Sequence, residues 1–116
     1  MALHHAQPAE VIDVRPYGTA IGAARSLALF KSTQLEVMRL VLAAGERMPD
    51  HRVNGEITLQ CLEGAVEVTV DGAASWLVAG HLMYVRGGVV HALRAEQASS
   101  VLVTVVLCPD GAGALA

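Results

Sequence analysis

The sequence predicts a single all-β domain, and three observations support this fold class. The chain has 116 residues, which is enough for one domain with its own core and too few for two. From Leu35 onward it divides into short runs rich in Val, Leu, Ile and Thr. Gly and Asp separate these runs at intervals of about 8 to 12 residues, as is typical of an all-β sandwich or barrel, and no long helical pattern competes with them.

The N-terminal part of the chain is less regular. Residues 10–14 (EVIDV) can form an edge strand, and the Ala- and Gly-rich residues 18–29 fit either a loop or a short helix. We therefore expect an N-terminal arm over residues 1–34, a β core over residues 35–108 and a flexible tail over residues 109–116. The strands expected from the apolar runs are 35–43, 56–63, 65–70, 75–78, 82–85, 91–95 and 100–107.

Turn residues fix two of the strand boundaries. Asp71-Gly72 supplies the positive φ angles of a tight hairpin, so the strands on either side of it should pair antiparallel. Glu63-Gly64 marks a second break between strands.

Composition excludes several classes of partner. The net charge is −3 and Lys31 is the single lysine, so the sequence contains no basic patch for nucleic acid. No apolar run approaches the roughly 18 residues that span a bilayer, and no leader pattern precedes the first strand, so we expect a cytoplasmic protein without a membrane partner. Because 53% of the residues are hydrophobic and 16% are charged, we expect apolar surface to be buried in a homodimer.

The reactive side chains are few. Cys61 and Cys108 lie in apolar β-type runs without a CxxC pair, where a free thiol behaves as a small hydrophobic group. His51 and His91 lie in loops or at strand ends, which is where β folds commonly place ligands. His81 is expected at the surface, and His4 and His5 in a mobile N-terminal segment.

One strand carries a polar face. Glu56, Thr58 and Gln60 are two residues apart, so their side chains point to the same side of the strand. Burying three polar groups without partners is costly, so this side must face either solvent or a polar cavity. If it faces the interior, it forms the pocket.

Two motifs resemble those of the cupin superfamily. The run from Gly45 through His51 to Gly64 is similar to the first cupin motif, Gly, five residues, His-x-His, three or four residues, Glu, six residues, Gly. The run from Gly80 is similar to the second motif, Gly, five residues, Pro-x-Gly, two residues, His, three residues, Asn, with Gly88 and His91 in register. This resemblance implies a cupin-type jelly-roll β-barrel, commonly dimeric.

The family's metal ligands are kept in part. In metal-binding cupins the two motifs supply three His and one Glu, which hold iron, manganese, nickel, copper or zinc. Of these positions the chain keeps His51 and His91. Val53 replaces the second His, and Ile57 or Thr58 falls on the Glu position; in the second motif Arg86 replaces Pro and Ala95 replaces Asn.

A divalent ion, with iron, manganese, nickel and zinc as the candidates, would need at least one further ligand from the protein. Glu56 would complete a 2-His-1-carboxylate set, and Gln60 offers a neutral carbonyl. Thr58 would line the pocket. Arg86 could bring positive charge to its rim, although a solvated arginine at a turn explains that residue better.

Three functions remain open at this point. The chain could be a metal-dependent enzyme acting on a small organic molecule, with His51, His91 and Glu56 or Gln60 as ligands. It could be a metal-free barrel that binds a small molecule, or a dimeric scaffold with a degenerate site. The fold cannot distinguish them, because function depends on the site.

Overall fold

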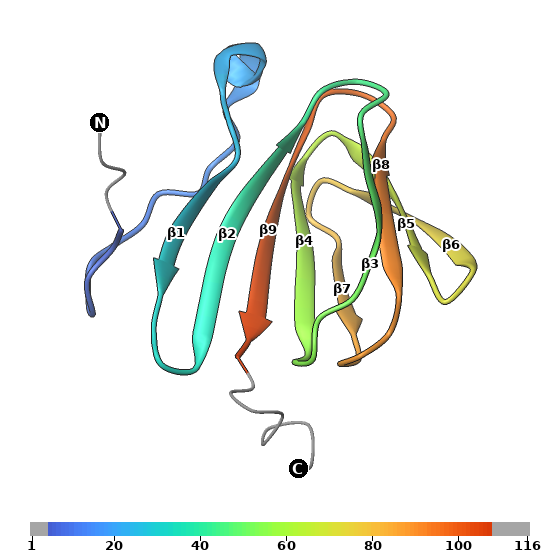
Figure 1. Ribbon diagram of the computed structural model, residues 1–116. Coiled ribbons are helices and arrows are strands. Elements are labelled where there is room, and N and C mark those ends of the chain that lie inside the picture. The colour runs from blue at the N-terminus through green and yellow to red at the C-terminus, as the bar shows by residue number, and fades with distance from the viewer. Residues whose placement is uncertain (1–4, 108–116) are drawn as a thin grey trace.

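Nine strands form two antiparallel sheets in the computed structural model, which describes residues 5–107 (Figure 1). A short 3-10 helix (Gly18–Ala23) precedes the first strand. The strands are β1 (Leu27–Lys31), β2 (Leu35–Leu42), β3 (Arg47–His51), β4 (Ile57–Glu63), β5 (Ala65–Val70), β6 (Ala73–Val78), β7 (Leu82–Val85), β8 (His91–Ala95) and β9 (Ser99–Val106). The all-β fold class is therefore confirmed.

The strand order shows that distant parts of the chain are neighbours. The five-stranded sheet has the order β1-β2-β9-β4-β7, and the four-stranded sheet has the order β3-β8-β5-β6. β9 pairs with β2 along its whole length, from Leu35 opposite Val106 to Leu42 opposite Ser99. β3 pairs with β8, and this pairing brings the two cupin-like motifs together.

All seven strands expected from residue 35 onward are present within one or two residues of their expected ends. The hairpin at Asp71-Gly72 is also confirmed: both residues have positive φ, 50° and 86°, and Val70 pairs with Ala73. A two-residue turn with two positive φ angles matches the twist of the strands that it joins.

Two strands were missed, and one expected strand is absent. β1 begins at the end of the Ala- and Gly-rich segment and extends to Lys31, and β3 has the polar sequence RMPDH with Pro49 in it. Both are edge strands, where a proline and polar side chains are tolerated. Residues 10–14 are not a strand: Val11 is 92% exposed, and Asp13 bonds locally to Arg15 rather than to a sheet.

The core lies between the inner faces of the two sheets. Along β4, Ile57, Leu59 and Cys61 are buried while the residues between them are half-buried, which is the period of two of a strand. Fully burying an aliphatic side chain contributes about 1.5–3 kcal/mol, so this alternation fixes which face of β4 turns inward. The other members of the core are Leu42, Val66, Val68, Leu77, Val85, Leu93, Ala95, Val101 and Val103.

Cys61 is completely buried, and this burial raises the pKa of its thiol. It is a free cysteine that packs as a small hydrophobic group, as expected. Cys108 and the expected tail at residues 109–116 lie outside the described residues. Within residues 5–107, no helix is long and apolar enough to cross a membrane.

A charged cluster fastens the N-terminal arm to the outer face of the five-stranded sheet. Arg39 is 3% exposed and forms an ion pair with Glu63 at 3.2 Å. The guanidinium also lies over the Tyr17 ring, 3.8 Å from its centroid. The backbone N–H groups of Tyr17 and Gly18 and the hydroxyl of Ser100 all donate to the Glu63 carboxylate. The arm is thus held by a nearly buried carboxylate that has several donors.

Candidate functional site

Two imidazole rings meet where β3 ends and β8 begins. His51 and His91 are directly opposite each other in the antiparallel pairing of these strands. Their ring centroids are 4.2 Å apart, and the ring planes are inclined by 58°. His91 is 3% exposed, whereas His51 is half-buried. The structure therefore joins the two histidines that the sequence had singled out, although they are forty residues apart.

Backbone carbonyls orient both rings in the same way. Nδ1 of His51 lies 3.2 Å from the carbonyl oxygen of Pro49, and Nδ1 of His91 lies 3.1 Å from that of Val89. A carbonyl oxygen can only accept, so each Nδ1 carries the proton and donates it. In a neutral ring this leaves Nε2 with a free lone pair. No residue among 5–107 forms a hydrogen bond to either Nε2.

Burial keeps His91 in its neutral form. The pKa of His91 lies below its ordinary value of 6.5, chiefly because burial disfavours the charged ring. The hydrogen bond to Val89 opposes this effect, and the nearby ring of His51 adds to it. At neutral pH His91 is therefore an imidazole with an electron pair to donate.

The two histidines line a cavity of about 80 Å³ between the sheets. Its other walls are apolar and come from both sheets, and no carboxylate is among the residues that line it. These residues are Met38, Leu40, Met48, Val53, Ile57, Leu59, Leu93, Val103 and Val105.

Two neighbouring loops hold the histidines in place. The N–H of Gly88, in the loop before His91, donates to the carbonyl oxygen of Val53, in the loop after His51, at 2.7 Å. Gly87 packs so closely against the carbonyl of Asn54 that a Cβ at position 87 would overlap that oxygen. The glycines of the second motif thus let two backbones approach each other beside the site.

The expected third ligand is turned away from the cavity. The carboxylate of Glu56 accepts a hydrogen bond from the Tyr84 hydroxyl at 2.7 Å, on the exposed side of β4 and β7. Thr58 and Gln60 lie on this same side, opposite Tyr84 and Leu82. These three polar side chains do share one face, as expected, but it is the outer face.

This placement corrects the expectation that Glu56, Thr58 and Gln60 line the pocket. The reason is the phase of β4. Ile57 and Leu59 gain more from burial than their polar neighbours, so they occupy the inner face and line the cavity instead. Among the residues that the structure describes, no three His, Cys, Asp or Glu side chains gather where a metal ion could be held. The divalent ligand set implied by the resemblance is therefore not assembled.

Two further predicted positions lie outside the cavity. Arg86 is exposed and is not among the residues that line it. His81 is exposed as expected, and its Nδ1 accepts a hydrogen bond from the backbone N–H of Val78 at 3.2 Å.

Sequence reasoning missed the two methionines in the cavity wall. Met38 belongs to the inward-facing positions of β2 together with Leu40 and Leu42, and this alternation was a signal that could have found it. Met48 could not be found in this way, because β3 was not recognised as a strand.

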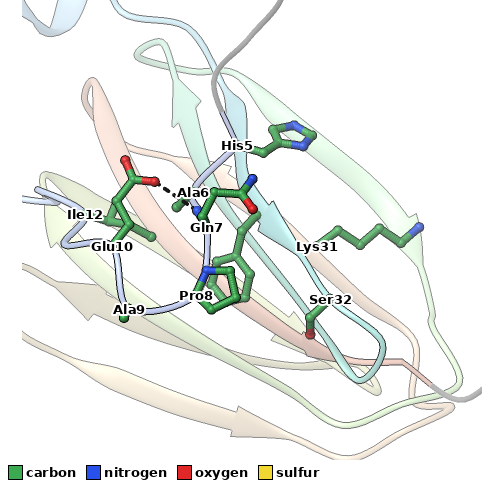
Figure 2. Close-up of a pocket in the computed structure, with 10 residues that line it drawn as sticks. His5, Ala6, Gln7, Pro8, Ala9, Glu10, Ile12, Lys31 and Ser32 are labelled. Carbon is green, nitrogen blue, oxygen red and sulfur yellow. Dashed lines mark hydrogen bonds between the residues drawn. The ribbon is translucent and has the colours of Figure 1, made fainter.

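A larger cavity lies elsewhere among the described residues and has a different character. It is an open groove of about 570 Å³ between the N-terminal segment and β1 (Figure 2). The Lys31 side chain extends away from Glu10, whose carboxylate accepts a hydrogen bond from the backbone N–H of Gln7 (Figure 2). The reactive side chains of this groove do not converge, so it carries less chemistry than the smaller cavity at the two histidines.

Solved structures of similar fold cover most of the chain. A conserved protein of unknown function from Streptococcus pyogenes has a TM-score of 0.69 and 22% identity to this chain. The alignment covers 91% of this chain and 94% of that protein. A cupin superfamily protein from Desulfitobacterium hafniense has a TM-score of 0.70 and 19% identity, and the alignment covers 89% of this chain and 94% of that protein.

An enzyme also shares the fold over part of its length. This enzyme is salicylate 1,2-dioxygenase from Pseudoaminobacter salicylatoxidans, in its adduct with gentisate. The alignment covers 69% of this chain but 24% of the enzyme, with a TM-score of 0.64 and 20% identity. At such identities these similarities concern the fold alone. No curated protein matches the sequence. The family model described as "Cupin domain" matches residues 38–107, from β2 to the end of β9, so the chain belongs to the cupin domain family.

Proposed function

We propose that this cupin domain binds one transition-metal ion between Nε2 of His51 and Nε2 of His91. The observation that carries the proposal is the pair of rings, each with its Nδ1 directed at a backbone carbonyl. A histidine that ligates a metal almost always donates its other ring N–H to a carbonyl, a carboxylate or water, which fixes the tautomer and the ring orientation. Both rings already have this arrangement.

The size of the cavity favours an ion over an organic molecule as its occupant. An engineered apolar cavity of about 150 Å³ accommodates benzene, and the cavity at the two histidines has about half that volume. It has room for an ion and a water-sized ligand. A larger organic molecule would have to approach from the side of His51, the more accessible of the two rings.

We also propose that the two sheets close around this cavity as a jelly-roll barrel of the cupin type. Support comes from its lining, to which β2, β4 and β9 of one sheet and β3 and β8 of the other all contribute. A crystal structure would test this closure.

A second candidate function is metal-free binding of a small apolar molecule, with the two imidazoles as hydrogen-bond partners. It is favoured by the apolar walls and by the lack of a carboxylate at the cavity. Such a molecule would have to be no larger than a few heavy atoms or would have to widen the cavity.

The experiment that separates these functions is elemental analysis of the untagged protein, purified without chelators or immobilised metal. Because His4 and His5 are adjacent and could bind metal on their own, both are replaced by Ala in the parent and in every variant. We expect close to one metal ion per chain in the parent and none in His51→Ala/His91→Ala. His81→Ala, which removes an exposed imidazole outside the cavity, is the matched control and should retain the metal.

Either of two results contradicts the proposal: a parent protein that contains no transition metal, or a double variant that contains as much metal as the parent. In the first case a search for small molecules that raise the melting temperature would test the metal-free function. Circular dichroism of each variant would show that loss of metal does not reflect loss of the fold.

A further inference from the structure

The donors around the two histidines differ from those of a divalent cupin centre. Val53 stands where the family's motif has its second His, and Ile57 is one of the two residues, with Thr58, that fall on its Glu position; Val53 and Ile57 line the cavity as apolar walls. Glu56, next to Ile57 in sequence, is bonded to Tyr84 on the outer face, and Asp50, next to His51, is exposed and is not among the residues that line the cavity. The cavity therefore offers a bound cation two imidazole nitrogens and no negative charge from its lining.

Two methionines share this cavity with the histidines. Met38 of β2 and Met48 of β3 line the same cavity as His51 and His91, so the sulfur donors come from both sheets. The third methionine of the described residues, Met83 in β7, packs against the core but does not line the cavity. Sulfur and imidazole donors with no oxygen ligand suit soft metal ions, among which thioethers favour Cu(I).

The local geometry of β3 brings one thioether to the same side as a histidine. Residues three apart on a regular strand point to opposite faces. The pairing of β3 with β8 is irregular between Met48, which lies opposite Leu93, and His51, which lies opposite His91. This irregularity allows Met48 and His51 to face the cavity together, in the manner of a β-bulge that redirects a side chain.

The charge of the ion is constrained by the same walls. Burying an ion in a medium of low dielectric constant is unfavourable unless opposite charge compensates it. In the Born treatment this free energy rises with the square of the charge, so a monovalent ion is much easier to accommodate than a divalent one in a site without a carboxylate.

We propose that the cavity is a cuprous site, in which Nε2 of His51 and His91 and the thioether sulfurs of Met38 and Met48 select Cu(I) over divalent metal ions. This inference rests on the proposed function in that the same two histidines provide the nitrogen ligands. It adds the identity of the ion and two ligands that the cupin-like motifs do not contain.

The test is a Cu(I) competition titration with a chromophoric Cu(I) chelator under anaerobic, reducing conditions, paired with Zn²⁺ and Co²⁺ titrations of the same protein. The parent again carries His4→Ala and His5→Ala. We expect one Cu(I) per chain and much weaker binding of both divalent ions. Met38→Leu and Met48→Leu keep similar volume and should each weaken Cu(I) binding roughly 10- to 100-fold, as loss of a supporting group in a metal site does.

The matched control is Met83→Leu, which removes a thioether outside the cavity and should leave Cu(I) affinity unchanged. Copper X-ray absorption of the Cu(I) protein should show sulfur neighbours in the parent, and these should be lost in Met38→Leu/Met48→Leu. Thermal melting of each variant without metal reports whether the core has been disturbed.

The outcomes distinguish this inference from the function on which it rests. If Zn²⁺ or Co²⁺ binds at His51 and His91 as tightly as Cu(I), or if the methionine variants leave Cu(I) binding and its sulfur signal unchanged, the cuprous site is refuted while a two-histidine metal site stands. If neither Cu(I) nor a divalent ion binds, both proposals fail.

Discussion

Gly87 lies directly against the backbone carbonyl of Asn54, and this contact joins the loop after His51 to the loop before His91. No other residue type fits at position 87 without moving one of the two backbones, since even a methyl group would overlap the carbonyl oxygen. The spacing of the two imidazoles therefore depends on a residue that has no side chain.

Gly87→Ala should push the two loops apart. We expect it to destabilise the fold by about 1–3 kcal/mol, as overpacking typically does, and to weaken metal binding as well. Urea unfolding and metal titration measure the two effects. Gly22→Ala is the control, because nothing lies within 4 Å of a Cβ at that position, and its effect should be within about 0.5 kcal/mol. Unchanged stability and metal affinity in Gly87→Ala would contradict the role of this contact.

Glu63→Gln should lower the free energy of unfolding much more than Glu67→Gln, although each carboxylate forms an ion pair at 3.2 Å. The Glu63 and Arg39 side chains are 14% and 4% exposed, whereas the Glu67 and Arg94 side chains are 28% and 38% exposed. Removing one partner of a buried pair leaves the other charge uncompensated, which costs about 3 kcal/mol or more. A surface pair contributes about 1 kcal/mol or less. Equal unfolding free energies for the two variants would refute this distinction.

Glu63 should also make stability depend on pH in the acid range. Burial acts to raise the pKa of this carboxyl, but hydrogen bonds from Ser100, Tyr17 and Gly18 together with the charge of Arg39 outweigh it, so its pKa lies below the ordinary 4.5. Because the folded-state pKa is the lower one, the stabilisation is complete above pH 4.5 and is lost as the pH falls through the folded-state value.

The measurement is the free energy of unfolding of the parent and of Glu63→Gln as the pH is lowered from about 6 to about 3, the range over which a carboxyl of this kind titrates. The difference between the two proteins should shrink toward acid pH. A constant difference would show that Glu63 contributes through packing rather than through its charge.

The homodimer expected from composition remains a prediction, and one surface is suited to test it. Leu82 and Tyr84 are 65% and 58% exposed in β7, on the outer face that also carries Gln60. If a second copy covers this face, Leu82→Asp should convert a dimer to a monomer in sedimentation equilibrium. Val11→Asp, which changes a 92% exposed residue outside the sheets, should have no such effect. A parent that is already monomeric would contradict the expectation.

The sequence predicts those parts of the fold that local chemistry determines. Asp71-Gly72 specifies its hairpin because two adjacent positive φ angles suit few residue pairs, and the alternating apolar positions mark the strands beside it. β3 could not be predicted from its own residues. Its polar segment with Pro49 becomes a strand by pairing with β8, far along the chain.

The residues of the candidate site also divide into those that the local sequence predicts and those that it does not. His51 and His91 were found because they fall in register with two spaced motifs. Glu56 was misplaced because it was chosen for its closeness to the Glu position of the motif, whereas the apolar Ile57 and Leu59 mark the inner face of β4 and leave Glu56 on the outer side. Met38 and Met48 were missed because a thioether cannot be told from an ordinary core side chain until the cavity that it lines is known.

The position of β3 at the edge of its sheet has a dynamic consequence. The strand is held by β8 on one side alone, so its local opening separates the two imidazoles without unfolding the core. A ligand that bridges His51 and His91 in the closed state would disfavour that opening by RT ln(1 + [L]/Kd), where [L] is the free ligand concentration and Kd is its dissociation constant from the closed state. Amide hydrogen exchange of residues 47–51 would then report occupancy of the cavity directly.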